Sequence, residues 1–438
     1  MFKTLKEALK IKEVRKKIFL TLLLLLVYRL GCWLPAPGIA MGTFKSVIDN
    51  DSGGFLSIIS AVSGSALANG AILALGVVPY INASIILQLL TVAIPSLERL
   101  SKQGEEGKKK IAFYTKITAL ILAIVQSVGI VVGFGVSSLD TAVFFGSAWA
   151  TGFVVVCILV AGAMFTVWLG DKISELGIGN GLSLLIFVGL LASAGTAIFD
   201  SITQVSASNL EYLWSLLIFA VAIVAIFGFI VLIDSAERRI PVQYAKQMKG
   251  RKMYGGQSTN IPIKINANGV MPIIFASAII TFPQLVMSIF WLNSDAYKWY
   301  SANLGAGTWP YLVVMAFLIL VFSYFNSQIT FNPEEISRQI QQNGGFIPGY
   351  RPGKPTAEYL KKVSNRLTLW GAIFLGLVAL IPSLLFKSLN TVLGLGMTGS
   401  LINAFSATGL LIVVSVALEL DKQLEAQLLM RNYKGFLK

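Results

Sequence analysis

Few side chains in this sequence could carry out covalent or acid–base chemistry. There is no histidine, which excludes histidine-based metal sites, Ser-His-Asp and Cys-His nucleophiles, and imidazole proton relays. The two cysteines, Cys32 and Cys157, both lie in apolar runs, so neither a disulfide framework nor a Cys-x-x-Cys site is available. We therefore expect no catalytic residue, no bound metal and no cofactor.

Phosphate-binding and ion-binding patterns are also missing. Residues 349–355 read GYRPGKP, which has the wrong glycine spacing for a nucleotide loop and a proline where a magnesium-binding serine or threonine is needed. The long apolar segments carry no central Asp or Glu. Apart from Lys116 at the start of the segment 113–135, their only basic residue is Arg29, near the end of the first segment. Ion-coupled transporters usually bind the driving ion on carboxylates inside the membrane. The sequence therefore disfavours a nucleotide hydrolase and a proton-coupled carrier.

The composition is that of a membrane protein. Of 438 residues, 55% are hydrophobic and 13% are charged, and the mean hydropathy is +0.74. An average soluble domain has about 25% charged residues. A helix needs about 20 mostly apolar residues to cross the hydrocarbon core of a bilayer, and ten runs qualify. We expect spans near residues 18–34, 70–92, 113–135, 148–169, 178–198, 213–233, 270–291, 309–326, 367–386 and 400–418.

The net charge of +14 is distributed unevenly along the chain. Of the 35 basic residues, 31 fall in the two tails and in alternate loops, which leaves only Arg29, Lys45, Lys298 and Lys387 for the other side. Positively charged loops stay in the cytoplasm, so both termini are predicted to be cytoplasmic. Tryptophans near span ends form the expected aromatic belt: Trp33, Trp149, Trp168, Trp214, Trp291, Trp309 and Trp370.

Two further segments do not fit a simple helical bundle. Phe55 to Ala68 is apolar but too short to cross, and we expect it to dip back into the membrane from outside, which implies a central cavity. The alternative is a short amphipathic helix on the outer surface. The second feature is a pair of long basic loops, 234–268 and 327–366, and loops of this length in a compact protein are usually functional.

Polar residues inside the spans have two possible interpretations. Small residues and isolated amides mostly permit close helix packing and interhelical hydrogen bonds. They could instead form a polar seam between helices that can open, and prolines within spans 2 and 7 favour this weakly. The residues concerned are Asn82, Gln88, Thr91, Gln126, Asn180, Ser277, Thr281 and Gln284, with Pro79, Pro272 and Pro283.

Six motifs in order make the chain similar to a known family. It resembles the SecY family, the channel subunits of the bacterial protein translocase, along essentially its whole length. The motifs are GVVPYINASIILQ at 76–88, GIGNG at 177–181, ERRIPVQYAK at 237–246, QSTNIP at 257–262, MPIIFAS at 271–277 and FIPGYRPG at 346–353.

The resemblance implies an all-α polytopic membrane protein in which ten transmembrane helices form two pseudo-symmetric five-helix halves around a central pore. The halves would be residues 1–205 and 206–438. A short re-entrant helix at about 55–68 would plug the pore, with Phe55, Leu56, Ile58, Ile59 and Val62. By motif position, an aliphatic ring at the pore waist would consist of Ile81, Ile85, Ile186, Ile274 and Ile412. For each isoleucine alone, ordinary packing against lipid or core is the competing interpretation.

The resemblance also implies a function and partners. The chain would pass unfolded, signal-bearing polypeptides across the bacterial cell membrane and release apolar segments sideways into the lipids between spans 2 and 7, near Thr91, Gln126 and Ser277. It would not be an enzyme. SecE-like and SecG-like small subunits would accompany it, and the SecA motor or the ribosome would dock on Arg238, Arg239 and Arg351, unless these are merely cytoplasmic positive charge. Rival functions are a secondary transporter of a small solute and a scaffold for membrane insertion.

Overall fold

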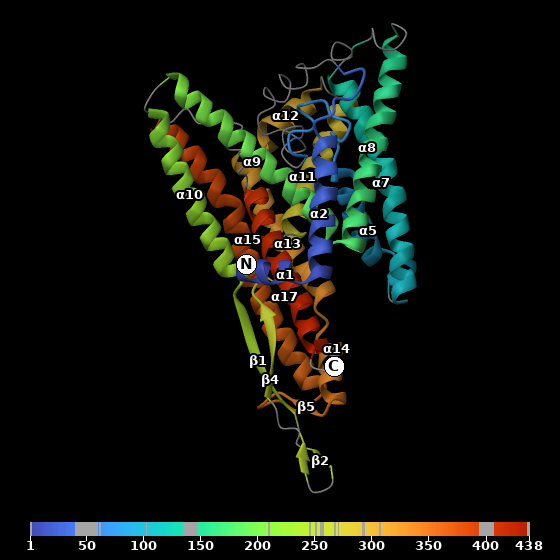
Figure 1. Cartoon of the computed structure of the whole chain (residues 1–438), viewed down its shortest axis with the longest axis vertical. Coiled ribbons are helices and arrows are strands. Elements are labelled where there is room, and N and C mark those ends of the chain that lie inside the picture. Colours follow the sequence, from blue (N-terminus) through green and yellow to red (C-terminus); the bar gives the residue numbers. More distant parts are fainter. Residues whose placement is uncertain are drawn as a thin grey trace.

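The structure is a computed structural model dominated by α-helices (Figure 1). The structure describes residues 2–39, 60, 63–101, 103–134, 140, 147–208, 211–244, 247–249, 252–254, 258–266, 269, 271–290, 294–305, 308–393 and 407–435.

Helices cover all ten predicted spans in whole or in part. Six of the described helices, α7, α8, α9, α10, α13 and α15, are long and apolar enough to cross a membrane, and α5 with α6 makes a seventh candidate that bends by 106°. The ten helices are α2 (Lys12–Gly31), α5 (Val78–Ala93), α7 (Glu105–Phe134), α8 (Ala148–Leu176), α9 (Gly181–Ser208), α10 (Glu211–Asp234), α11 (Met271–Phe290), α13 (Trp309–Thr330), α15 (Lys354–Leu393) and α17 (Ala407–Gly435).

Large apolar side chains project outward from these helices. Phe153 of α8 is 71% exposed, and Val224 of α10 and Val313 of α13 are similarly uncovered. A soluble monomer rarely leaves such extended apolar surface in water. These faces therefore suit contact with lipid, as the composition predicts.

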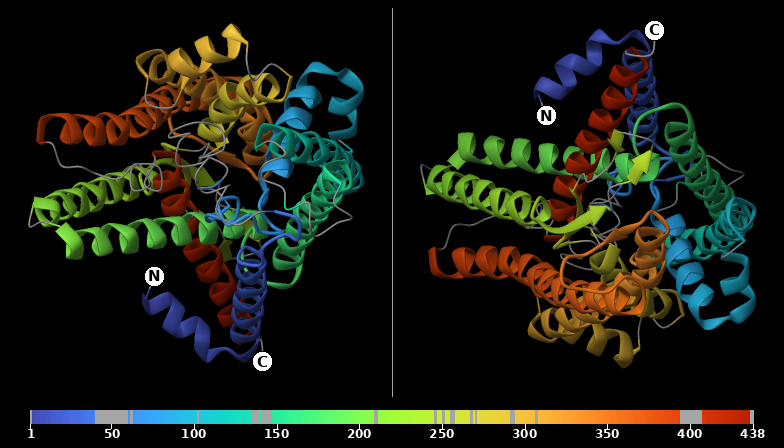
Figure 2. Two further views of the ribbon diagram at one scale, coloured as in Figure 1. Left: turned by 90° about the horizontal axis from the view of Figure 1, so that it is seen from above. Right: turned by 90° about the horizontal axis from the view of Figure 1, so that it is seen from below.

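Four shorter helices complete the helical part: α1 (Phe2–Lys10), α6 (Pro95–Ser101), α12 (Asp295–Leu304) and α14 (Pro333–Gln342). Side-chain caps begin α12, α13 and α14, where Ser294, Thr308 and Asn332 each accept a hydrogen bond from a backbone N–H in the first turn. Such caps satisfy donors that a helix start leaves unpaired. At the chain ends, α1 lies beside α17, and Ala8 and Leu424 belong to one apolar cluster (Figure 2).

The second predicted span is shorter than expected. Residues 63–77 form consecutive buried turns instead of a helix, and α5 begins only at Val78, where Pro79 fits the first helical turn because it needs no backbone donor there. The helix predicted for 55–68 therefore does not continue through 63–68. The predicted plug residues Phe55, Leu56, Ile58, Ile59 and Val62 lie outside the described residues.

The two long basic loops contain structure that the sequence analysis did not predict. Strand β1 (Glu237–Tyr244) pairs antiparallel with β4 (Ser258–Lys264) and with the short β5 (Gly345–Phe346), in the order β4-β1-β5. Strands β2 (Gln247–Lys249) and β3 (Lys252–Tyr254) pair further along the hairpin. β1 tolerates Pro241 because β5 reaches only Gln243 and Tyr244, so no strand lies beside the proline on that side.

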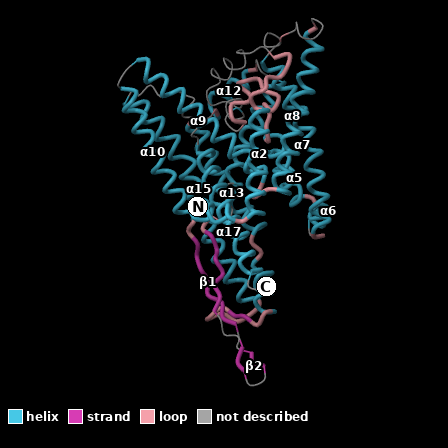
Figure 3. The backbone as a smooth tube through the Cα atoms, in the orientation of Figure 1, coloured by secondary structure: helices cyan, strands magenta, loops and turns pink. Residues whose placement is uncertain are grey.

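These strands and the loop helices share a small apolar core of their own. Ile240 and Val242 alternate inward along β1 and cluster with Ile340 of α14, Ile347 and Leu360 of α15. α15 begins at Lys354, about three turns before its predicted membrane span, so the end of loop 327–366 is helical. Figure 3 shows the hairpin extending beyond the ends of the membrane helices.

Close packing of α8 against the segment 63–77 depends on a glycine. A Cβ at Gly162 would collide with the backbone carbonyl of Ile72 and approach Leu73. We therefore expect Gly162→Ala to destabilise the protein by about 1–3 kcal/mol, because a backbone atom cannot move aside as a flexible side chain can. The measurement is thermal unfolding of the purified protein in detergent.

The matched control is Gly195→Ala in α9, where an added Cβ would meet nothing within 4 Å. This change should be neutral or slightly stabilising, because alanine is the better helix former. Equal unfolding midpoints for the two variants would contradict the close contact between α8 and Ile72.

Candidate functional site

Isoleucines from four helices far apart in the sequence meet in one apolar cluster. Ile186 of α9 and Ile412 of α17 are buried there, and Ile81 of α5 and Ile274 of α11 pack against the same cluster. Ile85, one turn after Ile81, lies in a second cluster that Ile81 and Ile274 also contact. The structure thus brings together the five isoleucines predicted from motif position.

The cluster joins helices of both predicted halves, and the isoleucine side chains contribute only apolar contacts to it. Ile186 is 7% exposed and Ile412 is 6% exposed, so these side chains are covered by neighbouring side chains. An apolar constriction excludes water and therefore ions. The chemistry available at this place is steric and hydrophobic closure, with no polar group on the isoleucines that would bind a solute.

A buried polar contact holds the segment that precedes α5. The Arg29 Nη1 of α2 donates a hydrogen bond to the Gly64 carbonyl oxygen at 2.9 Å. Gly64 has a positive φ of +70°, and a Cβ there would lie 3.0 Å from the Gly189 carbonyl oxygen of α9. The segment 63–77 is therefore wedged between α2 and α9.

Sequence analysis noted Arg29 only as an isolated charge and missed this contact. The available signal was its position within an apolar span, since a charge there needs a nearby acceptor. The acceptor is a backbone carbonyl, and no sequence pattern identifies it. Arg29 thus ties the first predicted span to Gly64, in the last part of the segment predicted to form the plug.

The three residues predicted at the side opening differ in their surroundings. The hydroxyls of Thr91 and Ser277 donate to carbonyl oxygens of their own helices, Leu87 at 2.7 Å and Ile274 at 2.9 Å, so these bonds do not join helices. Gln126 of α7 is 2% exposed, and its Oε1 has no hydrogen-bond partner among the described residues. It is the one of the three that is fully buried.

The surroundings of Gln126 involve both predicted sides of the opening. Its neighbours at helical spacing, Ala123 and Ile130, cluster with Val78 of α5 and Val286 of α11, and α7 packs against α5 and α11. An unsatisfied buried amide oxygen costs roughly 1–3 kcal/mol. The contact of α7 with its two neighbours is therefore weaker here than an all-apolar contact of the same shape.

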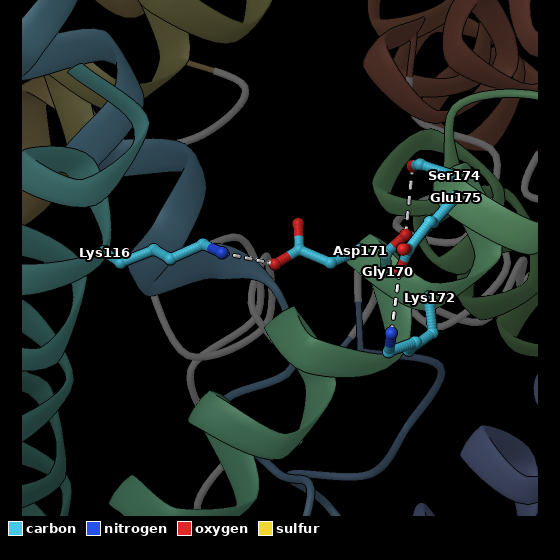
Figure 4. A network of polar contacts seen from close by, with 6 residues as sticks. All are labelled: Lys116, Gly170, Asp171, Lys172, Ser174 and Glu175. Carbon is cyan, nitrogen blue, oxygen red and sulfur yellow. Dashed lines mark hydrogen bonds and ion pairs between the residues drawn. The ribbon is translucent and has the colours of Figure 1, made fainter. Parts of the chain in front are cut away.

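Charged groups near the α7 and α8 ends form the contacts shown in Figure 4. Lys116 Nζ of α7 lies 2.6 Å from Asp171 Oδ2 of α8, and Lys172 bonds to Glu175 at 2.7 Å. Both side chains of the first pair are about 40% exposed, so the pair contributes at most about 1 kcal/mol. Its main effect is to set the position of α7 relative to α8.

The turn between α8 and α9, residues 177–181, packs onto the first predicted span. The Thr21 hydroxyl of α2 accepts a hydrogen bond from the Ile178 N–H, and the Ser174 hydroxyl accepts one from the Gly181 N–H. Asn180 caps α9 by accepting from the Leu182 N–H at 3.1 Å. The GIGNG motif therefore has a structural role in joining α2, α8 and α9.

The adjacent arginines of β1 point to opposite faces of the strand. Arg239 is directed outward, and its Nε bonds to Glu237 Oε1 at 2.9 Å. Arg238 lies on the face of Ile240 and Val242, toward α15. Sequence analysis grouped the two arginines as one docking contact, and the strand separates them because successive side chains alternate.

Arg351 occupies a firmly held loop. The Thr356 hydroxyl donates to the Arg351 carbonyl oxygen, and the Ser337 hydroxyl donates to the Gly353 carbonyl oxygen, both at 2.7 Å. Gly349 adopts a positive φ of +87° in the turn before Arg351. The exposed Arg351 side chain lines an open groove of about 610 Å³ with Tyr350 and residues around β5. A solvent-facing guanidinium on a backbone held in this way suits bidentate recognition of carboxylate or phosphate.

Another basic contact lies at the base of the hairpin. Burial lowers the pKa of Lys264 on β4, and the neighbouring Lys422 of α17 lowers it further, while Asp234 and Glu419 oppose the shift. Like charges thus lie side by side where β4 leaves the membrane helices. Lys264 and Lys422 therefore repel each other at the base of the hairpin, next to the carboxylates of Asp234 and Glu419.

Comparison with known proteins gives one consistent family. The family model SecY matches residues 71–420 of the chain. Protein translocase subunit SecY of Thermus thermophilus is 40% identical over 442 residues, covering 100% of this chain and 98% of that protein. Protein translocase subunit SecY of Mycobacterium tuberculosis is 40% identical over 450 residues, covering 98% of each.

Solved structures agree with the fold. A structure described as a protein-conducting channel has a TM-score of 0.63 and 18% identity, covering 94% of this chain and 91% of that chain. Sec61 in a canine ribosome–channel complex from the endoplasmic reticulum has a TM-score of 0.62, also at 18% identity and with the same coverage. At this identity the likeness concerns the fold, and it confirms the predicted all-α polytopic architecture.

The Arg29 contact generates a prediction about local stability. We expect Arg29→Met to increase amide hydrogen exchange of residues 63–77 by roughly tenfold or more, because a hydrogen bond from a charged donor contributes about 1.5–3 kcal/mol. The measurement is hydrogen–deuterium exchange with mass spectrometry on the purified full-length protein.

Arg15→Met provides the control, since Arg15 lies on the same helix, is exposed and undergoes the same chemical change. It should leave exchange of 63–77 unchanged. Protection of this segment that is equal in the wild type and in Arg29→Met would show that the arginine does not hold it.

Proposed function

The chain belongs to the SecY family, and we propose that it is the central protein-conducting channel of a Sec translocase, passing unfolded, signal-bearing polypeptides across a membrane. The observation that carries this proposal is the isoleucine cluster, in which α5, α9, α11 and α17 contribute to one apolar seal. The proposal includes that the chain is not an enzyme, and that a partner supplies the driving force.

Aliphatic side chains suit a seal that must open for many sequences. Isoleucines pack against each other when the channel is at rest and can repack around an extended polypeptide, because they make no directional bonds. A charged ring would bind oppositely charged cargo too tightly. We assign the seal to Ile81, Ile85, Ile186, Ile274 and Ile412. We assign the plug that supports it to residues from about 55 to 68, a segment in which Gly64 accepts the Arg29 hydrogen bond.

Opening of the channel would separate two halves. The predicted division at residue 205 falls inside α9, which ends at Ser208, so we place the boundary after Ser208. The first half contributes α5 and α7 to the side opening, and the second contributes α11. Lateral release is favoured because an apolar signal segment gains about 25 cal/mol for each Å² moved from water into lipid. The buried, unsatisfied Gln126 marks where this contact would separate, near Thr91 and Ser277.

Orientation and partners follow from the loop end of the molecule. The β hairpin, α14 and the C-terminal end of α17 extend from the same end of the bundle in Figure 1, and the basic loops favour a cytoplasmic location for it. Arg239 and Arg351 are the exposed cations that we assign to docking of SecA or the ribosome. SecE-like and SecG-like subunits would cover lipid-facing helices in the bacterial cell membrane, with both termini cytoplasmic.

The test of the proposed channel combines import with crosslinking. The full chain is reconstituted with a SecE-like subunit in liposomes, given SecA and ATP, and a signal-bearing precursor is stalled in transit. Photocrosslinkers at residues 81, 186, 274 and 412 should each join to the precursor, because the seal surrounds the chain in transit.

A photocrosslinker at the outward-facing Phe153 should give no precursor adduct, since this side chain is 71% exposed on the lipid-facing surface. Uptake of a small solute without import of the precursor would favour the rival transporter. Adducts of equal yield at Phe153 and at the four ring positions would also overturn the assignment.

Docking through Arg351 yields a separate prediction. Arg351→Glu should reduce SecA-driven translocation by roughly tenfold or more, because it replaces a charge-assisted hydrogen-bond donor with a repelling carboxylate. The measurement is the amount of protease-protected precursor, normalised to the amount of channel inserted in the membrane.

Arg338→Glu is the control, because Arg338 is an exposed arginine of α14 in the same basic loop. It should retain most translocation. Normal translocation by Arg351→Glu, with equal abundance of both variants, would remove Arg351 from the docking surface.

A further inference from the structure

A second groove lies beside the Arg351 surface and shares Tyr350 with it. It has a volume of about 330 Å³, within the range of small-molecule sites. Arg238 of β1 and Lys362 and Arg366 of α15 supply three cationic side chains to its lining. The remaining lining residues are Tyr350, Tyr359, Val363, Leu367 and Trp370.

Three of the lining residues follow one face of α15 from the aqueous side toward the lipid. Lys362, Arg366 and Trp370 recur every fourth residue, so they occupy one face of α15 with about 6 Å of rise between neighbours. Trp370 is 66% exposed, as expected of a tryptophan at the headgroup level. Arg366 therefore lies one turn on the aqueous side of the interface, where lipid phosphates are located.

Apolar surface continues directly from this level. Leu369, Ile373 and Leu377 of α15 are each about 40% exposed or more. This surface is suited to acyl chains. The cationic groove and the apolar face of α15 beyond it together complement the anionic headgroup and the acyl chains of a phospholipid.

The three cations are not neutralised within the protein. Arg238, Lys362 and Arg366 form no ion pair or hydrogen bond with side chains among the described residues, and no carboxylate belongs to the lining. Glu237 bonds to Arg239 on the other face of β1, and Glu358 lies a turn farther from the membrane than Lys362. Like charges gathered around one groove repel each other, and a bound anion would relieve this repulsion.

Two tyrosines give the groove a firm wall. The rings of Tyr350 and Tyr359 stack with centroids 4.1 Å apart at an angle of 27°. Their hydroxyl groups are donors that suit a phosphate oxygen. The wall joins the Arg351 loop to α15, so a ligand in the groove would contact both long loops at once.

We propose that this groove binds the phosphate headgroup of an anionic phospholipid in the leaflet at the basic end of the protein. Arg238, Lys362 and Arg366 would contact the phosphate, and the acyl chains would lie along α15 beyond Trp370. Basic pockets beside membrane helices are suited to such headgroups. The inference rests on the membrane location of the chain and not on what the channel conducts.

The position of the groove favours a lipid phosphate over an RNA phosphate as its ligand. Arg366 and Lys362 lie about 6 Å and about 12 Å before Trp370 along α15, so an RNA strand would have to lie against the bilayer surface to reach them. Arg239 and Arg351 project away from this groove toward solvent and remain available to a macromolecular partner.

The experiment places the full chain in phosphatidylcholine nanodiscs that contain a photoactivatable phosphatidylglycerol. Crosslinks to peptides covering residues 359–370 are quantified by mass spectrometry. Arg238→Gln with Lys362→Gln should reduce these crosslinks roughly tenfold, because each basic residue near a membrane surface adds to anionic lipid affinity. The matched control is Arg239→Gln with Lys361→Gln, which removes the same charge from adjacent residues outside the groove and should retain the signal.

Competition distinguishes the source of the phosphate. Crosslinks that persist with added inorganic phosphate or a single-stranded RNA oligonucleotide, at matched ionic strength, would support the lipid site. Displacement by inorganic phosphate would overturn it in favour of a free-anion site, and displacement by RNA would assign the groove to a nucleic acid. Equal crosslinking by the two double variants would also overturn the proposal, whether or not either variant still translocates protein.

Discussion

The proposed channel must close a path through the membrane with side-chain contacts that can also separate. Inside hydrocarbon, every backbone polar group must be satisfied within the protein, so the spans are helices. The contact between the halves is different, because it consists of side chains. In the proposed channel, Ile186, Ile412, Ile81 and Ile274 would close it through apolar contacts of their side chains. Many weak contacts give a tight seal, and none requires an exact partner. A seal of this kind can be lost and regained around cargo of any sequence.

The same requirement explains why tight backbone packing is found away from the seal. Gly162 contacts the chain at Ile72, Gly181 contacts the Gly170 carbonyl, and the Arg29 guanidinium fixes Gly64. These contacts lie within the first half, among α2, α8, α9 and the segment 63–77. Hydrogen bonds and glycine contacts demand fixed geometry, so they suit a body that moves as a unit. In the proposed channel, rigid packing within the first half and a mostly apolar contact between the halves would allow opening to occur at the boundary.

Sequence alone was sufficient for features that depend on local hydropathy or on motif position. Apolar length predicted ten spans, and a described helix overlaps each of them; the motifs selected isoleucines that lie in two adjoining apolar clusters. Prediction from the sequence was wrong where tertiary contacts override the local preference for a helix or a loop. Residues 70–77 are apolar enough for a helix, yet they form turns, with Ile72 packed closely against Gly162 of α8 and with Gly70 and Gly76 at positive φ. The hairpin was missed because β1 contains Pro241 and only five residues of alternating pattern, which loop composition obscured. The sequence also could not show that Arg238 and Arg239 separate.

The separation of Arg238 from Arg239 gives the two side chains different surroundings at the loop end of the molecule. A strand sends neighbouring side chains to opposite faces, so one arginine can face the membrane while the next faces solvent. Arg239 has a single weak surface partner in Glu237, which an incoming carboxylate or phosphate could replace at little cost. Arg238 is instead in a groove with Lys362 and Arg366, and it gains most from an anion that stays there. A lipid phosphate held in that groove would tie β1 to α15 and, through the Tyr350 and Tyr359 stack, would stiffen the loop that presents Arg351. The membrane surface would thereby help to organise the site where a soluble partner docks.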